Sequence, residues 1–392
     1  MSDHRLENAT PKVLRNAEVV LPDRTLLADM VLRGPMVEAL APAGQGRGTE
    51  IYDLEGKRVT PGLIDVHVHG GWGVDFYRDD ADTIATTAEK FLASGVTSVL
   101  LTLHPGPPKE LLDRVHNAAE ACDRSKVFAG IHLEGPFLAP DRKGALPSEG
   151  ILAFDAELME KLIDAARGKL RTLTFAPEAI PAPALRGLSS LGIGLSIGHT
   201  SADAAQTHAA IEAGARRCTH LCNAMPPIHH RDPGPILTAL LDDRVRVELI
   251  CDGEHLDDRM IDLALRLKGP EGVIAVSDAM PLAGLGIAAG TFCGQEVQSD
   301  GVRATLADGT LAGSVALLPA ALRRTATALN LSAPAVVALG STAAARDLGL
   351  PRTGRIGSGC RADLAIWDGE EAVGTLRGGE GELPESWRWE SA

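Results

Sequence analysis

The stretch Thr60-Pro61-Gly62-Leu63-Ile64-Asp65-Val66-His67-Val68-His69-Gly70-Gly71 decides the fold class. An apolar run follows the Pro-Gly pair, and such a run is typical of a buried strand. Side chains alternate between the two faces of a strand, so His67 and His69 point the same way. Two imidazoles on one face at the end of a buried strand make half a metal site. The alternative interpretation is a pair of core histidines held by hydrogen bonds.

Seven more apolar segments follow, separated by runs with helical periodicity. These strand candidates are residues 96–101, 129–134, 173–176, 194–199, 218–221, 247–252 and 273–278. Eight strand–helix units predict an α/β fold of the TIM (β/α)8 barrel type. Residues 281–312 interrupt the rhythm after the eighth strand, and we expect a hairpin over residues 297–311. An insertion after a barrel strand lies on the catalytic face.

Both ends of the chain differ from this repeat. Residues 12–60 contain short strands separated by turn residues, and residues 361–367 form another strand after Gly-Ser-Gly. Because neither end makes a complete β domain by itself, we expect the two to build one small β-sandwich. The predicted domains are the N-terminal and C-terminal parts of this sandwich and the catalytic barrel between them, at residues 1–60, 356–392 and 61–355.

Composition excludes several classes of protein. The 392 residues carry a formal net charge of −14, which argues against nucleic acid and against an anionic membrane surface as partners. No apolar run reaches about 18 residues, so we expect no membrane span. The polar start predicts no signal peptide, and the six cysteines form no CxxC pair. These features favour a cytoplasmic protein with reduced thiols.

Potential metal ligands and one further carboxylate stand at the carboxyl ends of the predicted strands. They are His67, His69, Glu134, His199, His220 and Asp278. In a TIM barrel these ends meet at one mouth, so four imidazoles and two carboxylates share a pocket. That set of donors indicates one or two divalent metals. Each residue alone has a simpler interpretation, as a structural core histidine or as a helix N-cap.

Glu134 carries an argument of its own. An apolar strand that runs into Glu-Gly-Pro places a carboxylate where burial without a partner would cost several kcal/mol. A metal removes that cost, and an ion pair with an arginine is the alternative. The fourth strand ends in Phe175-Ala176-Pro177-Glu178, with no lysine that could bridge two ions. If two metals bind, Glu134 must therefore bridge them.

Several longer motifs resemble the amidohydrolase superfamily, and within it the family of N-acetylglucosamine-6-phosphate deacetylases. The matching motifs are PGLIDVHVHG, GIHLEGPFL, SIGHTSAD, THLCNAMPPIHHRDPG, DGEHLD, SDAM and LAGS. They occur in the order of the family and span nearly the whole chain, including both parts of the β domain. NAMPPIHHRDPG is specific to this deacetylase family.

The resemblance implies a role for each matching residue. Glu134, His199 and His220 would hold the principal metal. His67 and His69 would hold a second ion, bridged by Glu134. Asp278 would be the general acid/base. The implied cofactor is one or two divalent metals per chain, zinc first, with iron, cobalt or manganese as alternatives.

Substrate contacts are implied at Ala145, Asn223, Ala224, Arg231, His255, Leu311, Ala312 and Gly313. Arg231 and His255 would bind the 6-phosphate, with Arg231 supplied by the neighbouring subunit of a homodimer. Leu146 follows Ala145, where some members of the family place a polar residue.

The expected reaction is metal-dependent hydrolysis of the acetamide of N-acetyl-D-glucosamine 6-phosphate to D-glucosamine 6-phosphate and acetate. It would serve amino-sugar catabolism and cell-wall sugar recycling. One alternative is N-acetylgalactosamine-6-phosphate deacetylation, and another is an amidohydrolase reaction on a cyclic amide. A third is a barrel that has lost catalysis and serves as a structural partner. The filled ligand positions count against the last alternative, and the motif around Arg231 counts against the second.

Overall fold

The computed structural model describes residues 10–389, which divide into two compact units. Within these residues the first unit comprises the chain up to Ile64, Glu89–Ser98 and the chain from Asn330, and the second comprises Asp65–Ala88 and Val99–Leu329. The domains predicted from the sequence, a β-sandwich of residues 1–60 and 356–392 and a barrel of residues 61–355, remain a prediction.

The middle of the chain forms a parallel sheet, most of whose residues belong to the second unit. Its strands are β6 (Leu63–Val68), β9 (Val96–Leu103), β10 (Phe128–Glu134), β11 (Leu170–Phe175), β12 (Gly194–Ile197), β13 (Ala215–Cys218), β14 (Arg246–Ile250) and β15 (Val273–Val276). Within residues 10–389 they form one eight-stranded sheet in chain order. The backbone N–H of Asp278 donates to the carbonyl of His67 at 2.9 Å, and Val68 bridges to Ala279. The first and last strands therefore meet, which confirms the predicted TIM barrel.

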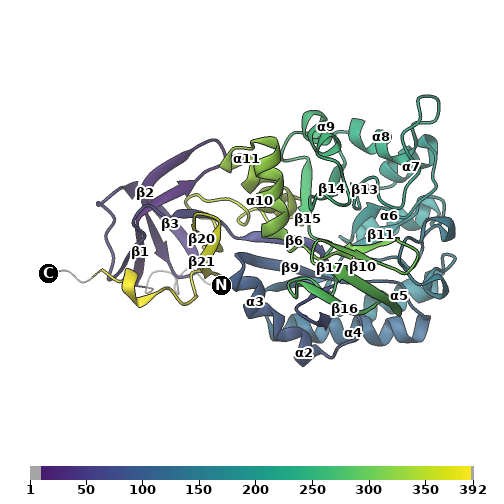
Figure 1. Cartoon of the computed structure of the whole chain (residues 1–392), viewed down its shortest axis with the longest axis horizontal. Helices are drawn as coiled ribbons and strands as arrows, with labels where there is room; N and C mark the ends of the chain where they lie inside the picture. The colour runs from purple at the N-terminus through teal and green to yellow at the C-terminus, as the bar shows by residue number, and fades with distance from the viewer. Residues whose placement is uncertain (1–9, 390–392) are drawn as a thin grey trace. The chain divides into compact units, whose positions relative to one another are not determined.

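Helices follow these strands and surround them, because parallel neighbours need a crossover connection (Figure 1). The helices are α2 (Ala81–Ala85), α3 (Thr87–Ala93), α4 (Pro108–Arg124), α5 (Ala156–Ala165), α6 (Ala182–Ser190), α7 (Ala204–Glu212), α8 (Gly234–Leu241), α9 (Asp258–Lys268) and α10 (Leu318–Leu329). Asp155, Asp203 and Asp257 cap α5, α7 and α9 by accepting backbone N–H groups of the first turn. Among the described residues, every helix is too short or too polar to cross a bilayer.

A further sheet lies between the eighth barrel strand and α10. Its strands are β16 (Ile287–Phe292), β17 (Gln295–Asp300), β18 (Arg303–Thr305) and β19 (Leu311–Ser314). The hairpin predicted over residues 297–311 is therefore too small, since the described chain forms a four-stranded antiparallel sheet here. The sequence of β16, Ile-Ala-Ala-Gly-Thr-Phe, lacks the β-branched alternation that marks a strand. Phe292 and Val297 of this sheet pack against Leu138 and Leu146 of the loop after β10.

The first unit joins the two ends of the chain in one sheet. Its strands are β1 (Pro11–Val20), β2 (Thr25–Arg33), β3 (Met36–Pro42), β4 (Glu50–Asp53), β5 (Arg58–Pro61), β20 (Leu364–Asp368) and β21 (Glu371–Leu376). Among the described residues the order is β21-β20-β5-β1-β2-β3, with β4 beside β1. C-terminal β20 pairs with N-terminal β5, which confirms that both ends build one β unit. Leu14, Met30, Val59 and Leu364 lie in its core. Helices α11 (Ala333–Val337) and α12 (Ala343–Asp347) belong to the same unit.

A chain of hydroxyl groups crosses the buried interior of the barrel. The Thr174 hydroxyl lies 2.7 Å from His132 Nε2 and 2.7 Å from the Thr219 hydroxyl, which in turn lies 2.6 Å from that of Ser196. Each hydroxyl can donate one bond and accept another, so the chain satisfies these buried polar groups. It also links the side chains of neighbouring strands in the barrel interior below the metal ligands.

We expect Thr174→Val to lower the free energy of unfolding by about 1–3 kcal/mol, because it leaves the buried Nε2 of His132 without its partner. The matched control is Thr172→Val on the same strand. Thr172 is equally buried, and its hydroxyl has no hydrogen-bond partner among the described residues, so its loss should be neutral or stabilising. Urea denaturation of the metal-loaded proteins measures both. Equal destabilisation by the two changes would contradict the role given to the hydroxyl chain.

Candidate active site

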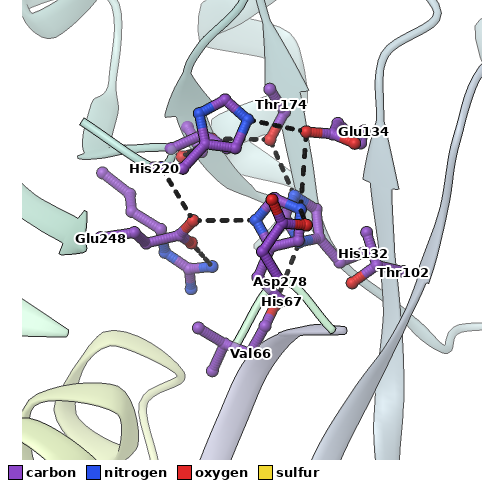
Figure 2. A network of polar contacts seen from close by, with 12 residues as sticks. Val66, His67, Thr102, His132, Glu134, Thr174, His220, Glu248 and Asp278 are labelled. Atoms are coloured by element: carbon purple, nitrogen blue, oxygen red, sulfur yellow. Dashed lines mark hydrogen bonds and ion pairs between the residues drawn. The ribbon is translucent and has the colours of Figure 1, made fainter. Parts of the chain in front are cut away.

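The predicted metal ligands come together at the carboxyl end of the barrel (Figure 2). His67 lies in β6 and His69 just after it, and Glu134 is the last residue of β10. His199 and His220 each lie two residues beyond the end of their strands, β12 and β13. Asp278 lies two residues beyond the end of β15. The structure places these six side chains in one buried cluster.

The backbone turns sharply where three of these side chains enter the mouth. His199, His220 and Asp278 have φ values of +46°, +26° and +49°. Such conformations cost about 1–3 kcal/mol in a residue with a side chain, and they persist where the surrounding structure enforces them. Gly198 allows close packing next to His199, since a Cβ on Gly198 would lie only 2.8 Å from side-chain atoms of Thr174 and Thr219.

Glu134 lies at the centre of the cluster. Its Oε1 is 3.0 Å from His199 Nε2 and 3.0 Å from His220 Nε2, and these two nitrogens are 3.1 Å apart. Its Oε2 is 3.2 Å from His69 Nε2, while His67 Nε2 lies 3.5 Å from Oε1. The carboxylate thus belongs to two groups of possible ligands. We name Glu134, His199 and His220 the first metal group, and His67, His69 and Glu134 the second.

Asp278 faces the second metal group. Its Oδ1 lies 3.4 Å from His67 Nε2 and 3.3 Å from His69 Nε2. Ser277, the preceding residue, turns its hydroxyl toward the backbone carbonyl of His67 instead, at 3.4 Å. Asp278 is therefore the carboxylate of this pair that reaches the ligands.

The electrostatics of the cluster favour charged forms. Burial alone would raise the pKa of Glu134, but the neighbouring His67, His199 and His220 outweigh it and hold that pKa well below its usual range. Burial would lower the pKa of His69, but the hydrogen bonds and charges of Asp278 and Glu134 outweigh it and raise that pKa to about 9. A proton on His69 thus offsets part of the carboxylate charge, and a metal ion would displace that proton.

The donor set fits a divalent metal. Ligands about 2.0–2.1 Å from a tetrahedral ion lie about 3.3 Å from one another, close to the separations of 3.0 and 3.1 Å in the first metal group. The Nε2 of His67 is buried and has no hydrogen-bond partner among the described residues. The ring nitrogens remote from the cluster are fixed in two cases, since His199 Nδ1 donates to the carbonyl of Arg142 at 2.7 Å and His67 Nδ1 bonds Glu248 at 3.1 Å. Such outer bonds direct Nε2 toward a metal.

A cavity of about 240 Å³ opens onto the cluster. The residues predicted to contact substrate that line it are Ala145, Asn223, Ala224, His255, Leu311 and Gly313. Leu146 lines it as well, whereas Ala312 is buried in the cluster of apolar residues beside it. Arg231 is not among the lining residues, and its exposed side chain lies 2.8 Å from His230 on the loop before α8.

Asp252 favours the cationic form of His255 at the wall of this cavity. Its Nδ1 lies 2.8 Å from Asp252 Oδ2, and Ser314 donates to the same oxygen at 2.8 Å. Burial would lower the pKa of His255, but the hydrogen bond and charge of Asp252 outweigh it and raise that pKa. A cationic imidazole at the wall suits an anionic group of a ligand.

The structure adds residues that the sequence interpretation did not identify. Phe292, from β16, lines the cavity with its ring centroid 5.3 Å from that of His69. Ile250 and Thr310 line it too. Glu248 lies behind the cluster and was visible as a lone charge within the apolar strand Val-Glu-Leu-Ile. Phe292 had no comparable signal, because its strand was not predicted.

Comparisons with known proteins agree with this site. The amidohydrolase family matches residues 58–385. N-acetylglucosamine-6-phosphate deacetylase of Bacillus subtilis (strain 168) is 38% identical, over 78% of this chain and 79% of its own. N-acetylgalactosamine-6-phosphate deacetylase of Escherichia coli O157:H7 is 32% identical, over 91% of this chain and 95% of its own. The crystal structure of N-acetylglucosamine-6-phosphate deacetylase from Pasteurella multocida superposes with a TM-score of 0.90 at 28% identity, covering 95% of this chain and all of that one. The chain belongs to the amidohydrolase family and is a relative of its N-acetylglucosamine-6-phosphate deacetylases.

Proposed function

We propose that the chain hydrolyses the acetamide of N-acetyl-D-glucosamine 6-phosphate to D-glucosamine 6-phosphate and acetate. One observation carries the proposal: a single cavity is lined by the shared Glu134 carboxylate, Asp278 and His255. Amide hydrolysis needs an activated water, a polarised carbonyl and a proton for the leaving amine. The identity to deacetylases over most of the chain supports the same reaction.

The residues divide this work between them. A divalent metal held by the first metal group would supply an acidified water and a polarised carbonyl. Asp278 Oδ1 takes the proton of the attacking water and passes it to the amide nitrogen, so that the amine can leave. Glu134 stays ionised because His67, His199 and His220 lower its pKa against the effect of burial. No serine or cysteine nucleophile is required.

The identity and number of the metals belong to this proposal. Three imidazole or carboxylate ligands and a free position suit catalytic zinc, and iron, cobalt or manganese take similar donors. The second metal group would hold a further ion, so two ions per chain is the proposed stoichiometry, and Glu134 belongs to both groups.

Substrate binding is proposed from the wall of the cavity. Asn223 and Ala224 approach the acetamide, and Asn223 Nδ2 already donates to the carbonyl of His220 at 3.2 Å, which leaves its Oδ1 to accept. The backbone turns at Ala145 and at residues 311–313 contact the sugar. His255 binds the 6-phosphate through a charge-assisted hydrogen bond.

Arg231 is proposed to act in a homodimer. Its side chain is exposed and lies outside the cavity of its own chain, so it would reach the phosphate bound by the neighbouring subunit. Light scattering coupled to gel filtration would measure the oligomeric state, and a monomer at assay concentration would exclude this role. A cytoplasmic location is proposed as well, because the six cysteines are free and five of them are buried in the described structure.

The reaction is tested by measuring acetate release from N-acetylglucosamine 6-phosphate and from N-acetylgalactosamine 6-phosphate. We expect release from the gluco substrate to exceed release from its epimer, to stop on chelation and to return when zinc is added back. The similarity to the E. coli galactosamine enzyme makes the epimer the proper comparison. Faster release from the galacto substrate would reassign the sugar. Release that persists after complete metal removal would contradict the mechanism.

Asp278→Asn should lower kcat by about 100-fold to 10,000-fold, because the amide cannot carry the proton to the leaving nitrogen. The metal content should stay at the wild-type value, since Asp278 belongs to neither metal group. Ser277→Ala is the matched control, because the Ser277 hydroxyl bonds the backbone rather than the cluster. Turnover of the Asn variant within a few-fold of wild type would remove Asp278 from the proton transfer.

Asp252→Asn should make phosphate binding weaken at a lower pH. The Asp252 carboxylate raises the pKa of His255, so His255 stays cationic to a higher pH in the wild type. Without that charge the pKa of His255 falls. As the pH is raised, KM for the phosphorylated sugar should therefore begin to increase at a pH about one unit lower than in the wild type. Unphosphorylated N-acetylglucosamine is the control substrate, whose KM should show no such shift. Identical pH profiles for variant and wild type would refute the phosphate role of His255.

A further inference from the structure

Glu248 is a buried carboxylate that the proposed reaction does not use. It lies in β14 between the apolar residues Val247 and Leu249, and its side chain is fully buried. Figure 2 shows its carboxylate directed at His67 and His220. A carboxylate in such a place costs several kcal/mol unless charged or hydrogen-bonded partners surround it.

Both oxygens of Glu248 have partners. Oε2 lies 3.1 Å from His67 Nδ1 and accepts the backbone N–H of His220 at 3.4 Å. Oε1 accepts a hydrogen bond from Arg217 at 3.1 Å. Arg217 carries a guanidinium, which stays charged in proteins, so it forms an ion pair with Oε1. One oxygen of Glu248 therefore pairs with Arg217, and the other faces a ring nitrogen of a predicted ligand.

This contact determines what His67 can do with its other nitrogen. A carboxylate paired with a guanidinium accepts hydrogen bonds, so His67 Nδ1 carries the proton of this contact. In the neutral ring the lone pair then lies on Nε2. That nitrogen lies 3.5 Å from Glu134 Oε1 and has no hydrogen-bond partner within the described part of the chain. The His132 ring packs edge-on against His67 with centroids 4.6 Å apart, which restricts rotation of the ligand.

A purely structural role explains these contacts less well. A buried Glu–Arg pair contributes little net stability, and apolar replacements are often as stable. Arg217 would satisfy one oxygen of Glu248 without any histidine. The bond to His67 is the contact that links the pair to the second metal group.

We propose that Glu248 is a positioning residue for a second metal ion. It accepts the Nδ1 hydrogen of His67 and so aims Nε2 at Glu134 and His69, while Arg217 pairs with its other oxygen. The second metal group can then retain a divalent cation in addition to the ion of the first group. This inference rests on the proposed metal-dependent function, but it concerns how many ions the chain retains and not which amide it cleaves.

The test counts metal rather than product. Wild-type protein and Glu248→Gln are equilibrated at a series of fixed free zinc concentrations, and the zinc per chain is measured by plasma mass spectrometry. We expect two ions in the wild type. In the variant we expect one ion at unchanged affinity and a second bound about 10–100-fold more weakly. Acetate release is assayed separately, so a failure of the proposed reaction would not alter the count.

Two further variants control for the chemical change from Glu to Gln and for misfolding of the single variant. Glu178→Gln makes the same chemical change at a carboxylate that accepts from the Thr200 hydroxyl at 2.5 Å and the Ser201 N–H at 2.6 Å, and it should retain two ions. Glu248→Gln combined with Arg217→Met removes both buried charges, and it replaces the single variant if that one does not fold. Loss of only the weaker ion in this double variant supports the proposal.

Three results would overturn the proposal. The first is a single ion in the wild type. The second is a folded Glu248 variant that binds two ions with wild-type affinity. The third is equal weakening of both ions together with a lowered melting temperature, since that pattern would indicate a structural role alone.

Discussion

The site depends on the contact of one carboxylate with four imidazoles. Glu134 is almost fully buried, and both of its oxygens lie within 3.5 Å of histidine nitrogens. Burial opposes its charge, and the surrounding rings restore it. Because a carboxylate and several imidazoles so close together need cations between them, protons or a metal must occupy the centre. The surrounding structure therefore keeps these five side chains converged.

The barrel accomplishes this in two ways. Its strand ends bend at residues with positive φ, such as His199 and His220, which turns the rings inward. Beneath them, polar groups that would be costly alone are joined in chains: Thr174 with His132, and Glu248 with His67. These buried contacts limit rotation of the ligand side chains. The proton transfer is carried out by Asp278 and the substrate.

The sequence was sufficient to predict the barrel and the ligand cluster, because strand alternation and the meeting of strand ends are local rules with a fixed geometric outcome. His67, Glu134 and Asp278 follow from those rules. The sequence was not sufficient to predict β16, because its Ala and Gly residues carry no strand pattern. It therefore did not predict Phe292 as a cavity residue either, since Phe292 reaches the cavity from that strand. The position of Arg231 relative to a partner chain depends on association, which one sequence does not determine.

The central claim is that Glu134, His199 and His220 hold a metal ion at the mouth of the barrel. Anomalous diffraction at the zinc edge, from crystals of zinc-loaded protein that releases acetate, tests it most directly. The account predicts a strong peak about 2.0–2.2 Å from Glu134 Oε1 and from the Nε2 atoms of His199 and His220. An active, zinc-loaded crystal with its anomalous density away from Glu134 would contradict the account.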